Sequence, residues 1–258
     1  MLLKLYDSKN INSEMIFISK IVDLGNQLLG RGAGSIKPQD EVKRLKYFLN
    51  EIDLAIDVGA NLGQYSSNLL KEFNVKELHL FEPLKSAFEN IEINSNVEKI
   101  IKNNKGLSEK NETLNIYFDD PKSQLASIYE RLNEKEFEGM QKYSQLVEFI
   151  KFDDYWVNEL NSRVIDVLKL DTEGHELHCL NGSKKALKFT KIVQFEFGST
   201  MVGSRTFFHD IYTLFENLNF QIYRIRPNGL YKLNNYKYKD EHFVFSNFLA
   251  LNKKLIEL

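Results

Sequence analysis

The sequence predicts a doubly wound α/β fold built on a mostly parallel sheet, and two observations predict it. From residue 51 onward, short apolar runs rich in branched and aromatic residues alternate with amphipathic stretches of helical periodicity. The order strand, helix, strand at this spacing indicates parallel strands joined by crossover helices. The composition agrees with a globular domain, since 43% of the residues are hydrophobic and 27% are charged.

Four apolar runs predict parallel strands and four amphipathic stretches predict helices. The strands are 54–58, 78–81, 164–170 and 192–197, and the helices are 63–73, 84–94, 175–187 and 207–218. Two further runs, 221–225 and 242–250, are separated by a segment that contains the turn sequence Pro227-Asn228-Gly229. They predict an antiparallel hairpin on the C-terminal side of the sheet.

Residues 1–50 predict a helical N-terminal extension that precedes the main domain, residues 51–258. Apolar residues recur at near-helical spacing over 16–29 and again over 42–49. The segment 29–35 between them contains three glycines. Because no strand precedes it, we predict a flexible turn there rather than a phosphate-binding loop.

Charge and cysteine content restrict the classes of function. The 34 basic and 36 acidic residues give a net charge of -2, without the basic excess expected of a nucleic-acid-binding protein. Cys179 is the single cysteine, so neither an internal disulfide nor a thiolate metal site is expected. No run approaches the roughly 18 to 20 apolar residues of a membrane helix. We therefore expect a soluble, cytoplasmic protein without a nucleic-acid or membrane partner; the oligomeric state is left open.

The most informative segment, 55–66, is a strand that runs into a glycine-containing turn and then into a helix. Open parallel sheets bind ligands at the carboxyl ends of such strands. A dinucleotide fingerprint needs glycine at positions 59, 61 and about 64, but Asn61 and Gln64 occupy two of these positions. Asp57 adds a carboxylate where a diphosphate would lie, and it would instead attract a cationic ligand. S-Adenosylmethionine is a ligand of this kind, because it has a sulfonium and an ammonium group and no phosphate.

Glu82 ends the next strand, about twenty residues beyond the glycine turn. A carboxylate at this place accepts hydrogen bonds from the two hydroxyls of a ribose and repels a 2'-phosphate. Asp57, the turn and Glu82 together predict a nucleoside cofactor with a cationic end.

Four motifs, in this order, resemble the FkbM-type methyltransferases. They are Ile56-Asp57-Val58-Gly59-Ala60-Asn61-Leu62-Gly63, Phe81-Glu82-Pro83, Leu168-Lys169-Leu170-Asp171-Thr172-Glu173-Gly174-His175-Glu176 and Phe195-Glu196. The resemblance covers about residues 52–200. It implies a class I methyltransferase (Rossmann-like) fold, S-adenosylmethionine as cofactor, and commonly the O-methylation of sugars or secondary metabolites.

The resemblance also implies roles for particular residues. Asp57, Gly59, Asn61 and Gly63 would surround the methionine part of the cofactor, Glu82 would hold the ribose, and Leu107 with Ser108 would border the adenine. Asp171 and Glu173 would close the reaction side of the pocket, with Glu196 beside them. Substrate choice is expected to lie in residues 1–50 and 200–258.

Methyl transfer to a hydroxyl needs alignment of the acceptor oxygen and a base for its proton. The candidate bases are Asp171, Glu173, His175 and Glu196; we favour Asp171 or Glu173, with His175 next. We predict no metal ligands, because the histidines of His175-Glu176-Leu177-His178 are three residues apart rather than four, although a divalent metal that assists the reaction stays open. The predicted function is O-methylation of a small acceptor, by resemblance a saccharide.

Several alternatives stay open at this point. An NAD-dependent dehydrogenase or a non-catalytic nucleoside-binding domain could have the same fold. Tyrosines alternate with Arg224, Arg226 and three lysines over 223–239, a pattern typical of an amphipathic hairpin but also compatible with bases or a sugar phosphate. The charged segment 129–143 predicts a surface helix or a lid.

Overall fold

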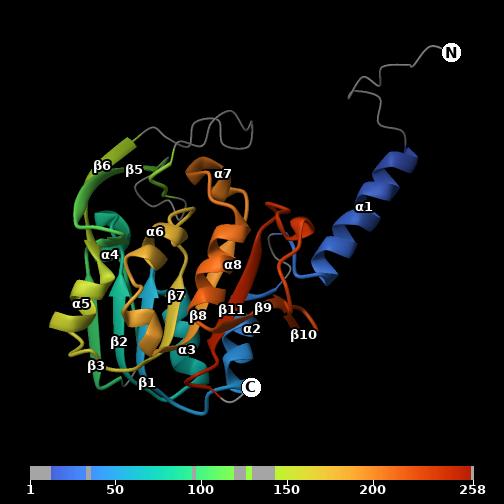
Figure 1. Ribbon diagram of the computed structural model, residues 1–258. Helices are drawn as coiled ribbons and strands as arrows, with labels where there is room; N and C mark the ends of the chain where they lie inside the picture. The colour runs from blue at the N-terminus through green and yellow to red at the C-terminus, as the bar shows by residue number, and fades with distance from the viewer. Residues whose placement is uncertain (1–12, 33–35, 95–96, 119–125, 130–142, 257–258) are drawn as a thin grey trace.

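The computed structural model describes residues 13–32, 36–94, 97–118, 126–129 and 143–256. An eight-stranded sheet runs through its centre (Figure 1). In spatial order the strands are β10 (Gly229–Lys232), β9 (Phe220–Arg226), β11 (Ser246–Asn252), β8 (Thr190–Phe197), β7 (Ile165–Leu170), β1 (Ile52–Val58), β2 (Val75–Phe81) and β3 (Lys99–Asn103).

The directions of the strands confirm the predicted class I methyltransferase fold. β1 lies in the middle, the chain builds β2 and β3 on one side and then returns to place β7 and β8 on the other, all in parallel. β11 is antiparallel to both of its neighbours, β8 and β9. The predicted antiparallel pairing of 221–225 with 242–250 is therefore present. The turn at Pro227-Asn228-Gly229 leads first into β10, a short edge strand that the prediction lacked.

Helices cover both faces of the sheet because its central strands, such as β7 and β8, carry buried residues on both faces. One face carries α5 (Phe152–Asn158), α6 (Glu176–Asn181) and α8 (Phe208–Asn217), and the other carries α2 (Pro38–Lys43), the 3-10 helix η1 (Arg44–Tyr47) and α3 (Gln64–Glu72). Shorter helices in the described part of the chain are α4 (Lys85–Glu89), η3 (Ala186–Phe189), α7 (Thr200–Ser204) and η4 (Tyr238–Asp240).

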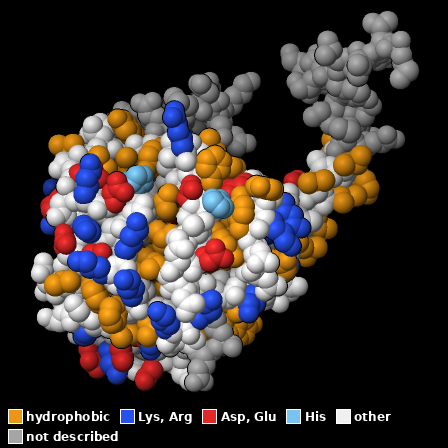
Figure 2. Space-filling model, in the orientation of Figure 1, with side chains coloured by type: hydrophobic (Ala, Val, Ile, Leu, Met, Phe, Trp, Pro, Cys, Tyr) orange, Lys and Arg blue, Asp and Glu red, His pale blue; other side chains and the backbone are white. Residues whose placement is uncertain are grey.

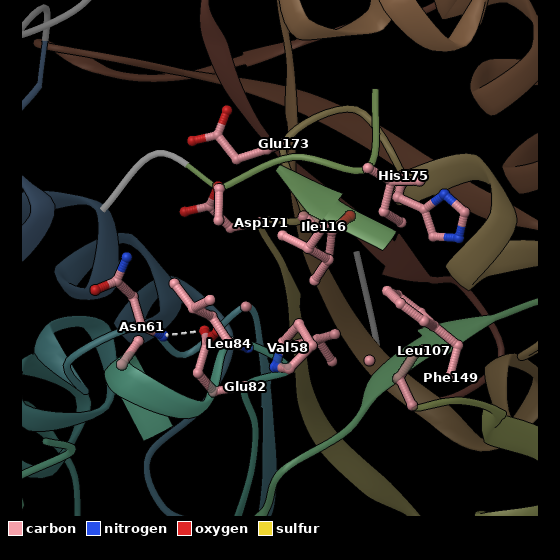
Figure 3. Close-up of a pocket in the computed structure, with 17 residues that line it drawn as sticks. Val58, Asn61, Glu82, Leu84, Leu107, Ile116, Phe149, Asp171, Glu173 and His175 are labelled. Carbon is pink, nitrogen blue, oxygen red and sulfur yellow. Dashed lines mark hydrogen bonds between the residues drawn. The ribbon is translucent and has the colours of Figure 1, made fainter. Parts of the chain in front are cut away.

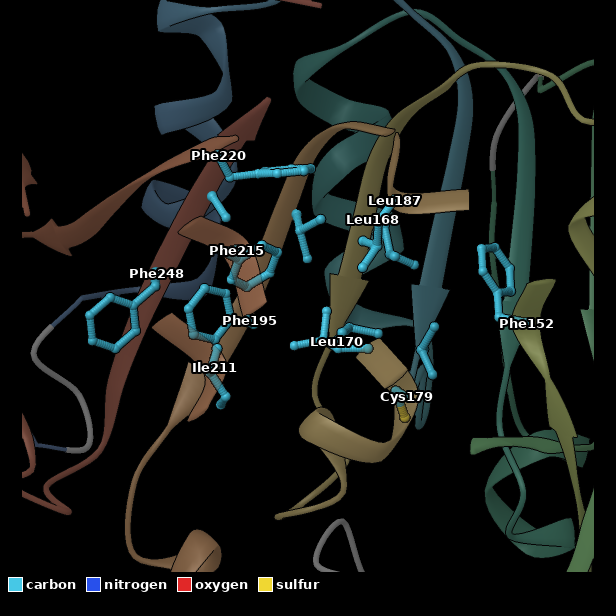
Figure 4. Close-up of a cluster of buried hydrophobic side chains, with 14 of the residues drawn as sticks. Phe152, Leu168, Leu170, Cys179, Leu187, Phe195, Ile211, Phe215, Phe220 and Phe248 are labelled. Atoms are coloured by element: carbon cyan, nitrogen blue, oxygen red, sulfur yellow. The ribbon is translucent and has the colours of Figure 1, made fainter. Parts of the chain in front are cut away.

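Aromatic side chains fill the core between α8 and the sheet (Figure 4). The Phe195 ring stacks on Phe248 at 5.2 Å and packs against Phe215 at 5.3 Å, and all three side chains are buried. Each such burial contributes about 1.5–3 kcal/mol to stability. This packing fixes the end of β8, where Glu196 lies, relative to the rest of the sheet.

A second, three-stranded sheet lies beside the carboxyl edge of the large one. Its order is β4 (Gly106–Ser108), β6 (Tyr143–Lys151) and β5 (Glu112–Phe118), with β4 parallel and β5 antiparallel to β6. The sequence analysis did not predict this sheet. The predicted lid or surface helix at 129–143 lies almost entirely outside the described residues.

The N-terminal segment contains the two predicted helices. α1 (Ser13–Leu28) projects from the body, and its apolar side chains are exposed, for example Phe17 at 65% and Leu28 at 61% (Figures 1 and 2). In contrast, Val42 of α2 and Leu45 of η1 are fully buried against the sheet. The division at residues 50 and 51 remains a prediction. Within the described residues, no helix has the length and apolar character needed to cross a bilayer.

Candidate active site

A pocket with about 720 Å³ of open space lies at the carboxyl ends of β1, β2 and β7, where the sequence predicts a ligand (Figure 3). The large sheet forms one side of it and the small sheet forms the other. The described lining residues are Val58, Gly59, Asn61, Glu82, Pro83, Leu84, Ala87, Gly106, Leu107, Ile116, Ala126, Ile128, Phe149, Asp171, Thr172, Glu173 and His175.

The turn after β1 brings backbone from two strands into contact. Gly59 has a φ of +73°, and a Cβ atom there would lie 1.8 Å from the carbonyl oxygen of Asp171. Only glycine fits this position. Asn61 has a φ of +51°, as its side-chain type predicts. The turn thereby places Gly59 and Asn61 in the pocket wall.

Glu82 is held by two backbone N–H groups. Asn61 N donates to its Oε2 at 2.8 Å and Leu84 N donates to its Oε1 at 2.8 Å. Burial raises the pKa of Glu82 to about 7, although these N–H groups act against the increase. Each carboxylate oxygen keeps a lone pair for a further donor, so Glu82 can accept hydrogen bonds from a vicinal diol.

Asp57 does not line the pocket. Its carboxylate is buried, accepts a hydrogen bond from Ser66 Oγ at 2.6 Å, and lies 3.3 Å from Lys169 Nζ. Lys169 Nζ also lies 3.2 Å from Asp171 Oδ2. Burial alone would lower the pKa of Lys169, but Asp171 and Asp57 outweigh it and raise the pKa above its ordinary value. The charge of Asp57, which the sequence analysis expected to attract the cofactor, is thus largely compensated by Lys169. Asp171 is the carboxylate that reaches the pocket.

Further acidic side chains surround Asp171. Glu173 lines the pocket with a φ of +54°, and Figure 3 shows it near Asp171, on the same side of the pocket as Asn61. Glu196, at the end of β8, is 4% exposed and does not line the pocket. Burial, then Asp171 and Glu173, raise the pKa of Glu196 well above its ordinary value. The surroundings of Glu196 therefore favour its neutral form, which weighs against the role of base that the sequence analysis gives it; that role stays a prediction.

Glu41 of α2 belongs to the same acidic region, which the sequence gave no means to predict. It accepts hydrogen bonds from Gln194 Nε2 at 3.1 Å and Asn247 Nδ2 at 2.8 Å. Burial, and then the charge of Asp171, raise its pKa to about 8. A residue of the N-terminal segment therefore contributes to the electrostatics of the candidate site.

The loop after β7 is fixed by Glu176, which begins α6. Its carboxylate is fully buried and accepts hydrogen bonds from Thr172 N at 2.7 Å and Gly174 N at 3.0 Å. This pair of bonds curls residues 171–175 over the pocket. Within the motif Asp171-Thr172-Glu173-Gly174-His175-Glu176, the last residue therefore has a structural role.

His175 is part of a buried hydrogen-bonded chain. Ser108 Oγ donates to Glu112 Oε1 at 2.7 Å, so it can only accept from His175 Nε2 at 3.2 Å. The other ring nitrogen then accepts from the hydroxyl of Tyr129 at 2.8 Å. Burial, together with His178, lowers the pKa of His175 to about 3. Both nitrogens are occupied and the ring is a weak base, so the geometry disfavours His175 as the proton acceptor.

Apart from Leu107, the sequence analysis did not identify the apolar residues of the pocket. Leu84 and Ala87 come from the turn and helix after β2, and Ile116 and Phe149 come from the small sheet. Figure 3 shows Leu107 and Phe149 together on the side opposite Asn61. This half of the pocket can receive a flat apolar ring next to Glu82.

The structure brings most of the predicted residues together. Gly59, Asn61, Glu82, Leu107, Asp171, Glu173 and His175 line the pocket, whereas Asp57, Gly63, Ser108 and Glu196 do not. Asp57 and Ser108 lie behind it as partners of Lys169 and His175, and Gly63 precedes α3. The described residues contain no group of three or more His, Cys, Asp or Glu side chains arranged to hold a metal ion.

We expect the free energy of unfolding to fall as the pH rises from 6.5 to about 8. Burial raises the pKa of Glu41 to about 8 and those of Glu82 and Glu176 to about 7, from 4.5, so the folded state keeps protons that the unfolded state has lost. Below pH 6.5, buried histidines such as His175 act in the opposite sense. Urea denaturation across this range measures the slope. Glu41→Gln should flatten it, and a rise in stability over the range would contradict the assignment.

A family model described as the methyltransferase FkbM domain matches residues 57–222. The solved structures similar to the chain include the FkbM methyltransferase of Methylobacillus flagellatus, with 14% identity and a TM-score of 0.46. That alignment covers 78% of this chain and 44% of the other, so the chain spans less than half the length of that relative.

Two further structures are similar over most of both chains. The magnesium protoporphyrin IX methyltransferase of Synechocystis, solved with bound SAM, has 11% identity and a TM-score of 0.44, covering 96% of this chain and 87% of the other. SMU.1697c of Streptococcus mutans, a putative methyltransferase solved in complex with SAH, has 11% identity and a TM-score of 0.43, covering 84% and 98%. No curated protein matches the chain.

Proposed function

Since the chain belongs to the FkbM methyltransferase family, we propose that it uses S-adenosylmethionine to methylate a hydroxyl of a small acceptor, by family resemblance a saccharide. The charge of the pocket carries this proposal. Glu82, Asp171 and Glu173 line it, and the described lining residues contain no lysine or arginine. A cationic sulfonium ligand fits such a wall, whereas a diphosphate would meet carboxylates without a facing cation.

The residues present fit the parts of this cofactor. Glu82, with a free lone pair on each oxygen, would accept the ribose hydroxyls. The apolar wall of Leu84, Ile116 and Phe149 would take the adenine, and Asp171 beside Gly59 and Asn61 would face the methionine end. When bound, S-adenosylmethionine supplies an electrophilic methyl group.

Asp171 and Glu173 are the side chains placed to receive the acceptor's proton. Both line the pocket, and the side chain of Asp171 is 40% exposed. Lys169 holds Asp171 in position, because the two groups are 3.2 Å apart and Lys169 is buried. The enzyme's part is then to align an acceptor hydroxyl with this carboxylate pair and to keep water out. Carboxylates that accept hydrogen bonds also suit a polyhydroxylated acceptor.

A thermal-shift comparison of two ligands tests the proposed cofactor. S-Adenosylhomocysteine at about 100 times its dissociation constant should stabilise the fold by about 2.7 kcal/mol. NADH, the cofactor of the alternative dehydrogenase, should leave the transition unchanged. Stabilisation by NADH and not by S-adenosylhomocysteine would refute the proposal.

Asp171→Asn is expected to lower methyl transfer by about 10²- to 10⁴-fold, the usual effect of losing a positioned base. Mass spectrometry of cellular glycans and small metabolites, with and without the protein, reports the product as a gain of one methylene mass. Binding of S-adenosylhomocysteine to the variant serves as the control, and it should weaken much less than methyl transfer does, because the asparagine keeps the shape of the side chain that faces the methionine end of the cofactor. Glu173→Gln, which removes the other candidate base, is measured in the same two assays for comparison. If Asp171→Asn weakens cofactor binding as much as it weakens transfer, Asp171 is a cofactor ligand rather than the base.

A further inference from the structure

Four basic side chains from three distant segments meet where α1 joins the body: Arg31, Arg224, Arg226 and His242. The backbones of these segments are in direct contact. A Cβ atom at Gly30 would lie 2.2 Å from the carbonyl oxygen of Ile225, and Gly32 N donates to Phe245 O at 2.7 Å. Figure 2 shows Lys and Arg side chains at this junction. We call these four residues the Arg31 cluster.

The positive charge of the Arg31 cluster is only partly compensated. Arg224 Nη2 lies 3.4 Å from Asp240 Oδ1, and this is the single ion pair that the cluster makes within the described residues. The guanidinium of Arg226 lies over the ring of Tyr231 at 3.7 Å. Burial and the neighbouring Arg31 lower the pKa of Arg224 to about 10. Three guanidinium groups therefore share one carboxylate in a partly buried place, which is unfavourable without a further anion.

The cluster also contains four unused hydrogen-bond donors. The Nε atoms of Arg31, Arg224 and Arg226 and the Nε2 atom of His242 are buried and have no hydrogen-bond partner. Val244 N donates to His242 Nδ1 at 3.2 Å, so the proton of the neutral ring sits on Nε2. Buried donors are nearly always paired, with protein, water or a bound ion. Their gathering at one place points to an acceptor-rich ligand.

We propose that the Arg31 cluster binds the phosphate group of a ligand. The planar guanidinium fork matches the oxygens of a phosphate ester, and such charge-assisted bonds are the strongest that these side chains form. A phosphate supplies the two things that the cluster lacks, which are negative charge and several hydrogen-bond acceptors. Gly30, which precedes Arg31, allows the chain to approach β9 closely and so brings Arg31 beside Arg224 and Arg226.

The cluster lies on the same edge of the sheet as the candidate active site. β9 runs in the same direction as β8, because both are antiparallel to β11, so Arg226 and Glu196 lie at the same edge of the sheet with β11 between their strands. The His242 ring is 6.5 Å from that of Phe197, the residue after Glu196. An acceptor extended from Asp171 along this edge, over the ends of β8 and β11, would bring an anionic group toward the cluster. The inference that the phosphate belongs to the acceptor, as in a sugar phosphate or a nucleotide sugar, rests on the proposed function.

Pyrophosphate binding to the full chain tests the site without any methyl transfer. Calorimetry and thermal shift should detect binding to the wild type, and Arg31→Gln should weaken it about 10- to 100-fold. Arg205→Gln, which removes a positive charge from the exposed end of α7, should bind like the wild type. S-Adenosylhomocysteine binding, measured on the same samples, shows separately whether the proposed cofactor site is intact.

The stability of the unliganded variant separates a binding role from a structural one. Because the side chain of Arg31 makes no hydrogen bond or ion pair within the described residues, Arg31→Gln should unfold at the same temperature as the wild type or higher. A structural residue would give a lower temperature. Failure of pyrophosphate to stabilise the wild type beyond chloride of equal ionic strength, or equal stabilisation of Arg31→Gln, would overturn the proposal.

Two sources of the phosphate are distinguished by further arms of the experiment. UDP-glucose that binds more tightly than pyrophosphate and competes with it identifies a soluble phosphorylated ligand. Co-sedimentation with vesicles containing phosphatidylglycerol, lost in Arg31→Gln, identifies a lipid headgroup, which the exposed apolar side chains of α1 would accompany. If neither soluble phosphates nor vesicles bind in an Arg31-dependent way, the cluster is not a phosphate site.

Discussion

Replacing Glu82 by alanine is expected to weaken S-adenosylhomocysteine binding about 100-fold or more. The carboxylate would accept two ribose hydroxyls, and hydrogen bonds to a charged group contribute about 1.5–3 kcal/mol each. Two such bonds at the lower limit correspond to about a hundredfold change in affinity. Isothermal titration of the wild type and the variant measures the difference.

Glu89→Ala is the matched control, since Glu89 lies on the adjacent α4, its side chain is 59% exposed, and its ion pair within the described residues is with Lys85 at 3.7 Å. It should bind like the wild type. The pH profile adds a second readout. Because burial raises the pKa of Glu82 to about 7, affinity should fall as the pH drops below this value, and Glu82→Ala should lose the dependence. If Glu82→Ala binds S-adenosylhomocysteine with unchanged affinity, Glu82 does not hold the ribose.

Lys169→Met is expected to lower the free energy of unfolding by about 3–5 kcal/mol, the usual effect of removing one partner of a buried ion pair. Asp57 is 1% exposed, and its Oδ1 has no aligned hydrogen bond, so its contact with Lys169 at 3.3 Å is the charge compensation of that oxygen. Without Lys169, a buried carboxylate would remain without a counter-ion. Urea denaturation of the two proteins gives the value.

Two further variants make this prediction specific. Lys76→Met removes the partner of Asp53 in an exposed pair at 2.6 Å and should leave the free energy of unfolding nearly unchanged. Adding Asp57→Asn to Lys169→Met should restore part of the lost stability, because the uncompensated charge is then gone. Equal losses of stability in Lys76→Met and Lys169→Met would contradict the stabilising role of the buried pair between Lys169 and Asp57.

The sequence was sufficient to predict the fold and one side of the site, because both depend on where the parallel strands end. Parallel strands align their carboxyl ends at one edge, so residues that follow apolar runs meet there. Gly59, Asn61, Glu82 and Asp171 are of this kind. The glycine-containing turn also carried a conformational signal, which the positive φ of Asn61 bears out.

The remaining features depend on register and on contacts over long distances in the chain. Lys169 sits directly opposite Asp57 in the pairing of β7 with β1, and no pattern within either strand shows that register. Glu41 reaches Gln194 from 153 positions away. Phe149 joins the pocket through the small sheet, whose pairing the sequence did not indicate. Asp57 was predicted to face the ligand because its counter-ion could not be identified from sequence.

The position of β11 affects how the chain can fold during its synthesis. This strand, Ser246–Asn252, lies between β8 and β9, yet it leaves the ribosome after every other strand described. Until then β8 has a bare edge, and the β9–β10 hairpin has no place on the sheet. A nascent chain that stalls before residue 246 would therefore expose a long apolar edge to aggregation or to chaperones. Assembly of the Arg31 cluster waits for the same event, since His242 and the end of β9 are positioned only once β11 has been inserted.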